Sequence, residues 1–329
     1  MKIDECGFPS ASEQVCRLIL TEDCNATCPH CFNANMRVGN HMSMETFRRA
    51  LALVSAPAIK LMGGEPTLHP DLPEIFSACH TVVSQVRLFT NGLQQEVLAG
   101  LDWRPGDTVT YNFFVANKTL TNQNYLWQRD ISRTFHVVVN TQTDFSRLYR
   151  KLRALAGVLR KQPEGVRARS GLAVSLDTQE NIFLHRQELQ RILYDVVRRA
   201  KLWGFRNVTR DHNIPVCFWT EEGMRTYLDR HLSHNATTAC MSPACASWIG
   251  IDGTVRHCNQ FPIQCGRITA ETSRADLASF YLRGRAAKRE LLAADGECQH
   301  CRHLERCLGG CFKAYHLDNQ VSLHRLKCA

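Results

Sequence analysis

Apolar and polar positions in the first two thirds of the chain follow two alternating periods. Short apolar runs predict buried strands, and longer segments with apolar residues every three or four positions predict helices. Strands are expected at residues 15–20, 59–64, 85–92, 107–116, 133–142, 171–176 and, more briefly, 206–211. Helices are expected at residues 43–54, 69–83, 145–161 and 187–203, the first capped by Ser43 and the last closed by Gly204.

This alternation of strand and helix predicts an α/β fold with a parallel sheet over about the first 215 residues. About six βα units are too few for a closed eight-unit barrel. We therefore expect a partial, open TIM-like barrel, (β/α)6, with its chemistry at the carboxyl ends of the strands. The pattern changes near residue 237, after which residues 275–292 form the clearest helix pattern. Two domains are expected, residues 1–236, with a bridging region from about 205, and residues 237–329.

Cysteine is unusually frequent, with 16 among 329 residues. The N-terminus has no cationic region leading into an apolar stretch, and no apolar run approaches the roughly 18–20 residues that span a bilayer. We therefore expect a soluble, cytoplasmic protein without a membrane partner. In that compartment, many cysteines indicate metal ligation or redox chemistry rather than a disulfide framework.

The first cysteine cluster follows the first strand directly. Cys24, Cys28 and Cys31 have the spacing C-x3-C-x2-C. Three thiolates on one short loop can hold three irons of a 4Fe–4S cubane and leave the fourth iron open to a ligand. Zinc is the alternative, but it requires a fourth nearby ligand, and His30 is awkwardly placed between two of the cysteines.

This motif resembles that of the radical S-adenosylmethionine (SAM) superfamily, in which the open iron binds SAM. The sequence GGEP at positions 63–66 follows the second strand, where the family binds the amino group of SAM. Glycines let backbone approach a ligand closely, and Glu65 supplies an anionic acceptor for the ammonium. Alone, GGEP could be an ordinary strand-to-helix turn. The sequence TNG at positions 90–92 also matches, and the order of the three motifs is more specific than any one of them.

The resemblance implies a set of cofactor contacts. His30 and Phe32 are expected near the adenine and the cluster loop, although both could simply pack locally. Asn112 and Asn140 are candidates for ribose contacts, although asparagines in strands often make only local hydrogen bonds. The full set of cofactor-binding candidates is His30, Phe32, Gly63, Gly64, Glu65, Pro66, Thr90, Asn91, Asn112 and Asn140.

The C-terminal cysteines resemble those of a SPASM domain, the extension that carries auxiliary clusters in many radical SAM enzymes. Their metal-ligand candidates are Cys240, Cys245, Cys258, Cys298, Cys301, Cys307, Cys311 and Cys328. The resemblance implies one auxiliary 4Fe–4S cluster on Cys240, Cys245, Cys258 and Cys311, and a second on Cys298, Cys301, Cys307 and Cys328. Two tetrahedral zinc sites are the alternative. A segment with so little apolar pattern needs a metal core to fold.

Three residues are candidates for catalysis. Cys217 and Cys265 could each donate a hydrogen atom to a substrate radical, or each could be an ordinary buried thiol. Asp211 could be the base for a dehydrogenation, or it could cap a turn. Cys16 and Cys79 lie in apolar patterns and are expected in the core.

The formal net charge of +9 suggests nucleic-acid binding at first sight. Thiolate ligation of three iron–sulfur clusters would lower it to about +4. The sequence also has no basic block interleaved with aromatic residues, so no nucleic-acid partner is expected.

The resemblance implies an enzyme that cleaves SAM reductively to a 5′-deoxyadenosyl radical, which abstracts hydrogen from a substrate carbon. Three 4Fe–4S clusters, SAM and a flavodoxin- or ferredoxin-type electron donor are expected. The leading substrate is a ribosomally made peptide that is cross-linked, dehydrogenated or epimerised. The first strand leaves no room for an N-terminal peptide-recognition domain of about 80 residues, so a leader peptide would bind a separate protein or the catalytic domain.

Two alternatives remain open. A small molecule, such as a sugar, aminocyclitol or nucleoside intermediate, could be the substrate. A non-catalytic zinc-binding module is the remote alternative, and the GGEP and TNG motifs speak against it.

Overall fold

The computed structural model describes residues 15–28, 30–31, 39–113, 126–177, 182–210, 218, 248–258, 263–293 and 296–300. The chain forms two compact units, each assembled from separate stretches of sequence. The first contains Met1–Tyr111, Asn124–Ser132 and Pro243–Ala287, and the second contains Asn112–Gln123, Arg133–Ser242 and Lys288–Ala329. Together they give an α/β fold with mostly parallel strands, as the sequence predicts.

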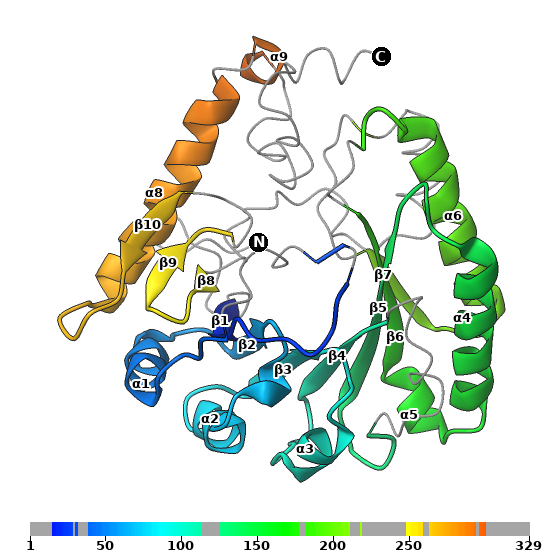
Figure 1. Cartoon of the computed structure of the whole chain (residues 1–329), viewed down its shortest axis with the longest axis horizontal. Coiled ribbons are helices and arrows are strands. Elements are labelled where there is room, and N and C mark those ends of the chain that lie inside the picture. Colours follow the sequence, from blue (N-terminus) through cyan, green and yellow to red (C-terminus); the bar gives the residue numbers. More distant parts are fainter. Residues whose placement is uncertain are drawn as a thin grey trace. The chain divides into compact units, whose positions relative to one another are not determined.

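The first unit is built on parallel strands with helices between them. Its elements in chain order are β1 (Val15–Thr21), α1 (Met44–Leu53), β2 (Ala58–Gly63), the 3-10 helix η3 (Pro66–Leu68), α2 (Leu72–Cys79), β3 (Gln85–Thr90), α3 (Gln95–Gly100) and β4 (Thr108–Asn112). Strands β1 to β4 pair in that order, all parallel. Figure 1 shows α1, α2 and α3 on one side of these strands.

The core of this unit lies between the strands and their helices. Leu18, Leu61 and Leu88 point into it from neighbouring strands and are fully buried. Phe47 of α1 and Phe76 of α2 are equally buried. Side chains alternate between the two faces of a strand, so the residues between these leucines lie on the opposite face.

Helix α1 forms where the sequence predicts it. The side chain of Ser43 accepts a hydrogen bond from the backbone N–H of Thr46 at 3.1 Å, as expected of an N-cap residue. Helix α2 is shorter than predicted and ends at Cys79. The β-branched residues that follow, Thr81, Val82 and Val83, disfavour continuation of a helix.

The first unit also contains strands that the sequence does not predict. They are β8 (Trp248–Ile249), β9 (Thr254–Arg256) and β10 (Gln264–Arg267). Helix α8 (Arg274–Ala293), which agrees with the predicted helix at residues 275–292, follows them and extends past the end of this unit at Ala287. Strand β8 extends the sheet by pairing parallel to β1, and β9 and β10 continue it antiparallel. The turn between β8 and β9 contains Gly253 at a φ of +80°, a conformation that glycine adopts readily. Strands of two to four residues carry too few positions to show a period.

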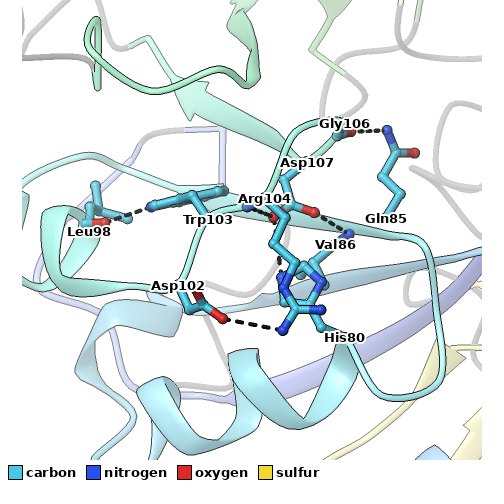
Figure 2. Close-up of polar contacts among 9 residues, drawn as sticks. All are labelled: His80, Gln85, Val86, Leu98, Asp102, Trp103, Arg104, Gly106 and Asp107. Atoms are coloured by element: carbon cyan, nitrogen blue, oxygen red, sulfur yellow. Dashed lines mark hydrogen bonds and ion pairs between the residues drawn. The ribbon is translucent and has the colours of Figure 1, made fainter.

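A polar cluster joins the amino ends of β3 and β4 (Figure 2). The buried carboxylate of Asp107 accepts hydrogen bonds from the backbone N–H groups of Val86 and Arg104, each at 2.8 Å. Its Oδ2 also lies 3.2 Å from Nε2 of His80, at the end of α2. One side chain therefore ties α2 and two strands together at the edge opposite the carboxyl ends.

The second unit contains β5 (Ser132–Val139), α4 (Phe145–Arg160), α5 (Glu164–Ala168), β6 (Ser170–Leu176), α6 (Arg186–Leu202), β7 (Asn207–Arg210) and α9 (Gly296–Gln299). Strands β5, β6 and β7 are parallel and pair in that order. Helices α4 and α6 agree with the predicted ranges to within one residue at each end. In Figure 1 both helices run along one side of these strands.

Candidate cofactor site at the strand ends

The loop that carries the first cysteines is anchored at the carboxyl end of β1. Oγ1 of Thr21 accepts a hydrogen bond from the backbone N–H of Asp23 at 2.9 Å, and Oδ1 of Asp23 accepts one from that of Cys24, also at 2.9 Å. Cys24, Cys28 and Cys31 are half-buried. The loop thus offers three accessible sulfur ligands from a fixed base.

The two glycines of GGEP let the end of β2 approach this base. The N–H of Gly64 donates to the carbonyl of Thr21 at 2.7 Å, and that of Glu65 donates to the carbonyl of Asp23 at 2.7 Å. A Cβ on Gly63 would lie 2.3 Å from the carbonyl oxygen of Thr21, and one on Gly64 would lie 2.0 Å from that of Asp23. The sequence predicts that these glycines let the backbone approach a ligand. In the structure they let the end of β2 approach the cysteine loop.

Glu65 joins the carboxyl ends of β2 and β3. Its carboxylate is fully buried. Oε1 accepts hydrogen bonds from Oγ1 of Thr67 and Oγ1 of Thr90, both at 2.7 Å, and from the N–H of Thr67 at 3.2 Å. Oε2 accepts one from the N–H of Asn91 at 2.6 Å. Burial raises the pKa of Glu65, and these hydrogen bonds oppose the rise.

The TNG motif forms the facing turn. Asn91 donates through Nδ2 to Oδ1 of Asn25 in the cysteine loop at 2.7 Å, and its own Oδ1 accepts from the N–H of Leu93 at 2.9 Å. Gly92 has a φ of +74°, which favours glycine. Asn25, Thr21 and Asp23 are contributors that sequence reasoning missed. Their position beside the cysteines was visible in the sequence, but their partners were not.

Asn112, the last residue of β4, and Asn140 fall on the second unit's side of the division between the units. Oδ1 of Asn112 lies 3.4 Å from Nδ1 of His136, whose Nε2 lies 2.7 Å from Oγ of Ser175. Asn140 accepts through Oδ1 from the hydroxyl of Thr143 and donates through Nδ2 to Asp177 at 3.2 Å. These are local contacts at strand ends, and a ribose-binding role stays a prediction.

Few of the predicted C-terminal site residues can be described. Cys258 is half-buried and Cys298 is buried. Cys265 is buried on β10, where its thiol donates weakly to the carbonyl of Ile263 at 3.7 Å, and burial raises its pKa. Phe32, Asp211, Cys217, Cys240, Cys245, Cys301, Cys307, Cys311 and Cys328 lie outside the described residues.

The donor chemistry of the cysteine loop fits an iron–sulfur cluster better than a preformed ion site. Within the described ranges, no three His, Cys, Asp or Glu side chains are grouped so that they could hold a metal ion. Cys24, Cys28 and Cys31 are nevertheless half-buried and on one loop, so their sulfurs can converge when a cluster binds. His30, half-buried in the same loop, is not gathered with them into a zinc-type site.

Comparison with known proteins gives a family match in the first half of the chain. Residues 18–155 match the radical SAM superfamily. The matched segment runs from β1 to α4 and includes the cysteine loop, GGEP and TNG. A match to this family indicates an enzyme, and the family implies a 4Fe–4S cluster and SAM.

The chain has curated relatives with several activities. It is 35% identical over 103 residues to a probable GTP 3′,8-cyclase of Pyrococcus horikoshii, a match that covers 30% of this chain and 32% of the relative. It is 37% identical over 84 residues to a 7,8-dihydro-6-hydroxymethylpterin dimethyltransferase of Methanocaldococcus jannaschii, covering 23% and 16%. The chain therefore matches about a third or less of the length of these relatives.

Solved structures match over most of the chain. SuiB of Streptococcus suis bound to S-adenosylmethionine superposes with a TM-score of 0.60 at 15% identity, covering 94% of this chain and 75% of SuiB. SuiB bound to its precursor peptide SuiA gives 0.60 at 14% identity, covering 94% and 74%. Identity this low establishes a shared fold. No helix among the described residues is long and apolar enough to cross a membrane.

Proposed function

We propose that this protein is a radical SAM enzyme that cleaves SAM reductively and modifies a ribosomally made peptide. The observation that carries the proposal is the hydrogen bonding between three strand ends. Glu65 and the two glycines hold the cysteine loop against GGEP and TNG. The bound cluster and SAM would supply a 5′-deoxyadenosyl radical that abstracts hydrogen from a substrate carbon.

In this proposal the residues of the chain bind the cluster and SAM and orient them for reaction. Cys24, Cys28 and Cys31 hold the cluster. Because the carboxylate of Glu65 is buried and accepts four hydrogen bonds, its role is to position the two turns, and the SAM ammonium is left to backbone groups at the end of β2. This revises the direct ammonium contact that the sequence suggests. Gly63, Gly64, Pro66, Thr90 and Asn91 shape the same pocket.

The proposed auxiliary clusters use the ligand sets given by the SPASM resemblance, with Cys258 in one and Cys298 in the other. They would accept an electron from the substrate radical in an oxidation. Cys217 or Cys265 would instead return a hydrogen atom in an epimerisation. Variants Cys217→Ala and Cys265→Ala separate the two routes. Unchanged product without solvent hydrogen in both variants would exclude a thiol donor.

The peptide substrate is supported by the likeness of fold to SuiB, which was crystallised with its precursor peptide. A small-molecule substrate is the second candidate, and the 35% identity over 103 residues to a probable GTP 3′,8-cyclase favours it. A precursor-peptide gene beside this one, with consumption of that peptide together with SAM, would decide for the peptide.

The test of the class is anaerobic reconstitution of the full chain with iron and sulfide. About twelve irons per chain, together with 5′-deoxyadenosine formed from SAM and a reductant, are expected for three clusters. Bound zinc without SAM cleavage would exclude the enzyme and favour the zinc-binding module.

A further inference from the structure

A cavity of about 310 Å³ lies in the second unit, at the amino ends of strands β6 and β7. Helices α4 and α6 end beside it, at Arg160 and Leu202. Its lining combines buried apolar side chains with basic ones, and no acidic residue is among the described residues that form it. The apolar and basic members are Leu159, Phe205, Arg160, Arg167, Lys201 and Arg206. We call this space the basic cavity.

Glu164, the first residue of α5, positions two of the arginines. Its Oε2 accepts a hydrogen bond from Nη2 of Arg167, and its Oε1 accepts one from Nη1 of Arg206. Both oxygens belong to one carboxylate, so the two guanidiniums are held side by side. Each guanidinium has five N–H donors in a fixed fork, and Glu164 uses one from each. Several donors of this pair therefore remain for a ligand.

The arginines of the basic cavity carry more charge than their surroundings offset. Glu164 supplies one negative charge to Arg167 and Arg206. Arg160 donates from Nη1 to the carbonyl of Trp203 at 3.3 Å, at the end of α6. The carboxyl-terminal ends of α4 and α6 each carry about half a negative charge. Glu164 and these two helix ends offset about two of the three arginine charges, so about one positive charge remains even with the lysine left out.

One donor of the pair lacks an acceptor. Nε of Arg167 is buried and has no hydrogen-bond partner among the described residues. A buried N–H group without an acceptor destabilises the folded state. The side chain as a whole is 37% exposed, so its guanidinium can turn towards the opening of the cavity. An anion bound there would supply the acceptor that Nε lacks.

The shape and chemistry of the lining favour a small organic phosphate. A phosphate monoester has three acceptor oxygens and nearly two negative charges at pH 7, and so can bind several guanidinium donors at once. A carboxylate has two oxygens and one charge. The cavity has the volume of a small-molecule site and is larger than a phosphate group needs. Leu159 and Phe205 provide an apolar wall for the rest of the ligand.

We propose that the basic cavity binds a small organic phosphate, with Arg160, Arg167 and Arg206 on its phosphate and Leu159 and Phe205 against its organic part. The inference does not depend on the proposed function. It assigns the second unit a ligand that none of the predicted cofactor contacts requires.

The basic cavity is separate from those predicted contacts. Ser170 begins β6 at the cavity, whereas Asp177 follows the last residue of that strand and accepts a hydrogen bond from Asn140. A strand of seven residues separates the two ends by about 20 Å. A ligand in the cavity would therefore act on the stability of the second unit, because binding to the folded state stabilises it by mass action.

The test is calorimetric titration of the anaerobically reconstituted full chain at constant ionic strength, with phenyl phosphate, inorganic phosphate and benzoate in separate runs. We expect saturable binding of phenyl phosphate, at least about fivefold tighter than that of inorganic phosphate, which lacks the apolar part, and of benzoate, which lacks the second charge. Arg167→Gln and Arg206→Gln should each weaken it about tenfold or more, because each removes charge-assisted hydrogen bonds.

Arg198→Gln is the matched control. It also removes an arginine of the second unit that pairs with a carboxylate, since Arg198 lies 3.7 Å from Asp195, but it does not line the cavity. Its affinity for phenyl phosphate should stay within about twofold of the parent. Circular dichroism identifies a variant that misfolds, and Arg167→Lys, which keeps the charge but loses the fork, then replaces Arg167→Gln and should also weaken binding.

Three results would overturn the inference. The first is the absence of saturable phenyl phosphate binding. The second is binding of benzoate or inorganic phosphate as tight as that of phenyl phosphate. The third is equal weakening by Arg198→Gln and by the variants of the cavity arginines, which would show that the anion responds only to the overall charge of the protein.

Discussion

Glu65 is the residue on which the candidate site depends most. Its carboxylate is fully buried yet accepts hydrogen bonds from Thr67, Thr90 and Asn91. A buried charged group is tolerated only when its hydrogen-bonding capacity is used in this way. Glu65 therefore acts through the two turns it joins, and its replacement should first lower the free energy of unfolding.

Glu65→Ala should lower the free energy of unfolding by about 3 kcal/mol, because it leaves buried donors on Thr67, Thr90 and Asn91 without an acceptor. Urea unfolding followed by circular dichroism measures the change. Glu74→Ala removes an exposed carboxylate that pairs with Arg48, and it should cost less than about 1 kcal/mol. Equal costs would show that the buried network contributes little.

Gly64→Ala should destabilise the protein by about 1–3 kcal/mol and displace the cysteine loop, since the added Cβ meets the carbonyl of Asp23. We expect weaker SAM binding in equilibrium dialysis as well as a lower unfolding midpoint. Gly100→Ala is the control, because nothing lies within 4 Å of its added Cβ and it ends helix α3. A Gly64→Ala protein as stable as Gly100→Ala would contradict the close approach.

At the scale of elements, the strand ends of the first unit and the helices of the second unit are held together by different kinds of contact. Backbone bonds and buried side chains hold β1, β2 and β3 at their carboxyl ends. Helices α4 and α6 are joined by a polar contact near the surface. Oδ2 of Asp195 accepts hydrogen bonds from the hydroxyl of Tyr149 and from Nε of Arg199, each at 2.6 Å. The guanidinium of Arg199 also lies 4.7 Å from the centre of the Tyr149 ring.

Tyr149→Phe should cost about 1 kcal/mol at pH 7. Burial alone would raise the pKa of Asp195, but hydrogen bonds from Tyr149 and Arg199 hold it below its ordinary value. A carboxyl whose pKa is lower in the folded state stabilises the fold above its unfolded pKa, and this contribution is lost as pH falls through the folded pKa. The cost of Tyr149→Phe should therefore shrink as the pH falls from about 5 towards 3.

Urea unfolding of parent and variant at each pH checks this expectation. Tyr194→Phe, on the outer face of α6, serves as the control for loss of a tyrosine hydroxyl. A cost that grows as the pH falls would contradict the assigned direction of the Asp195 pKa.

At the scale of the whole molecule, the cysteines divide into core residues and proposed ligands. Cys16 lies on the helix-covered face of β1, and burial raises its pKa to about 12, so it is poorly suited to ligation. Cys24, Cys28, Cys31 and Cys258 are half-buried. Exposure separates these four from Cys16, whereas Cys298, a proposed ligand of the second auxiliary cluster, is buried.

Single replacements should reveal separate clusters. Cys24→Ser is expected to lose about four of twelve irons and all SAM cleavage. Cys258→Ser is expected to lose about four irons while still forming 5′-deoxyadenosine without substrate, because its cluster is distinct. Iron analysis and quantification of 5′-deoxyadenosine give both results. Cys16→Ala should keep the full iron content, and a loss there comparable to that of Cys24→Ser would contradict this division of the cysteines.

The sequence by itself determined the longer elements and the chemical content of the site. Residues 145–161 and 187–203 showed a helical period over four turns or more, and α4 and α6 follow it closely. The cysteine spacing, GGEP and TNG predict a cofactor site because their residue types are chemically restrictive at fixed offsets. The short strands β8, β9 and β10 could not be found, since so few residues show no period.

Only the tertiary structure decided what those residues do to one another. The sequence made Glu65 a ligand contact, whereas its neighbours on β3 surround it with donors and bury it. The sequence did not place Arg17, Lys60 and Arg87 side by side, because their positions become neighbours only once three strands pair in register. Burial and register depend on residues far apart in the chain, and local pattern does not contain them.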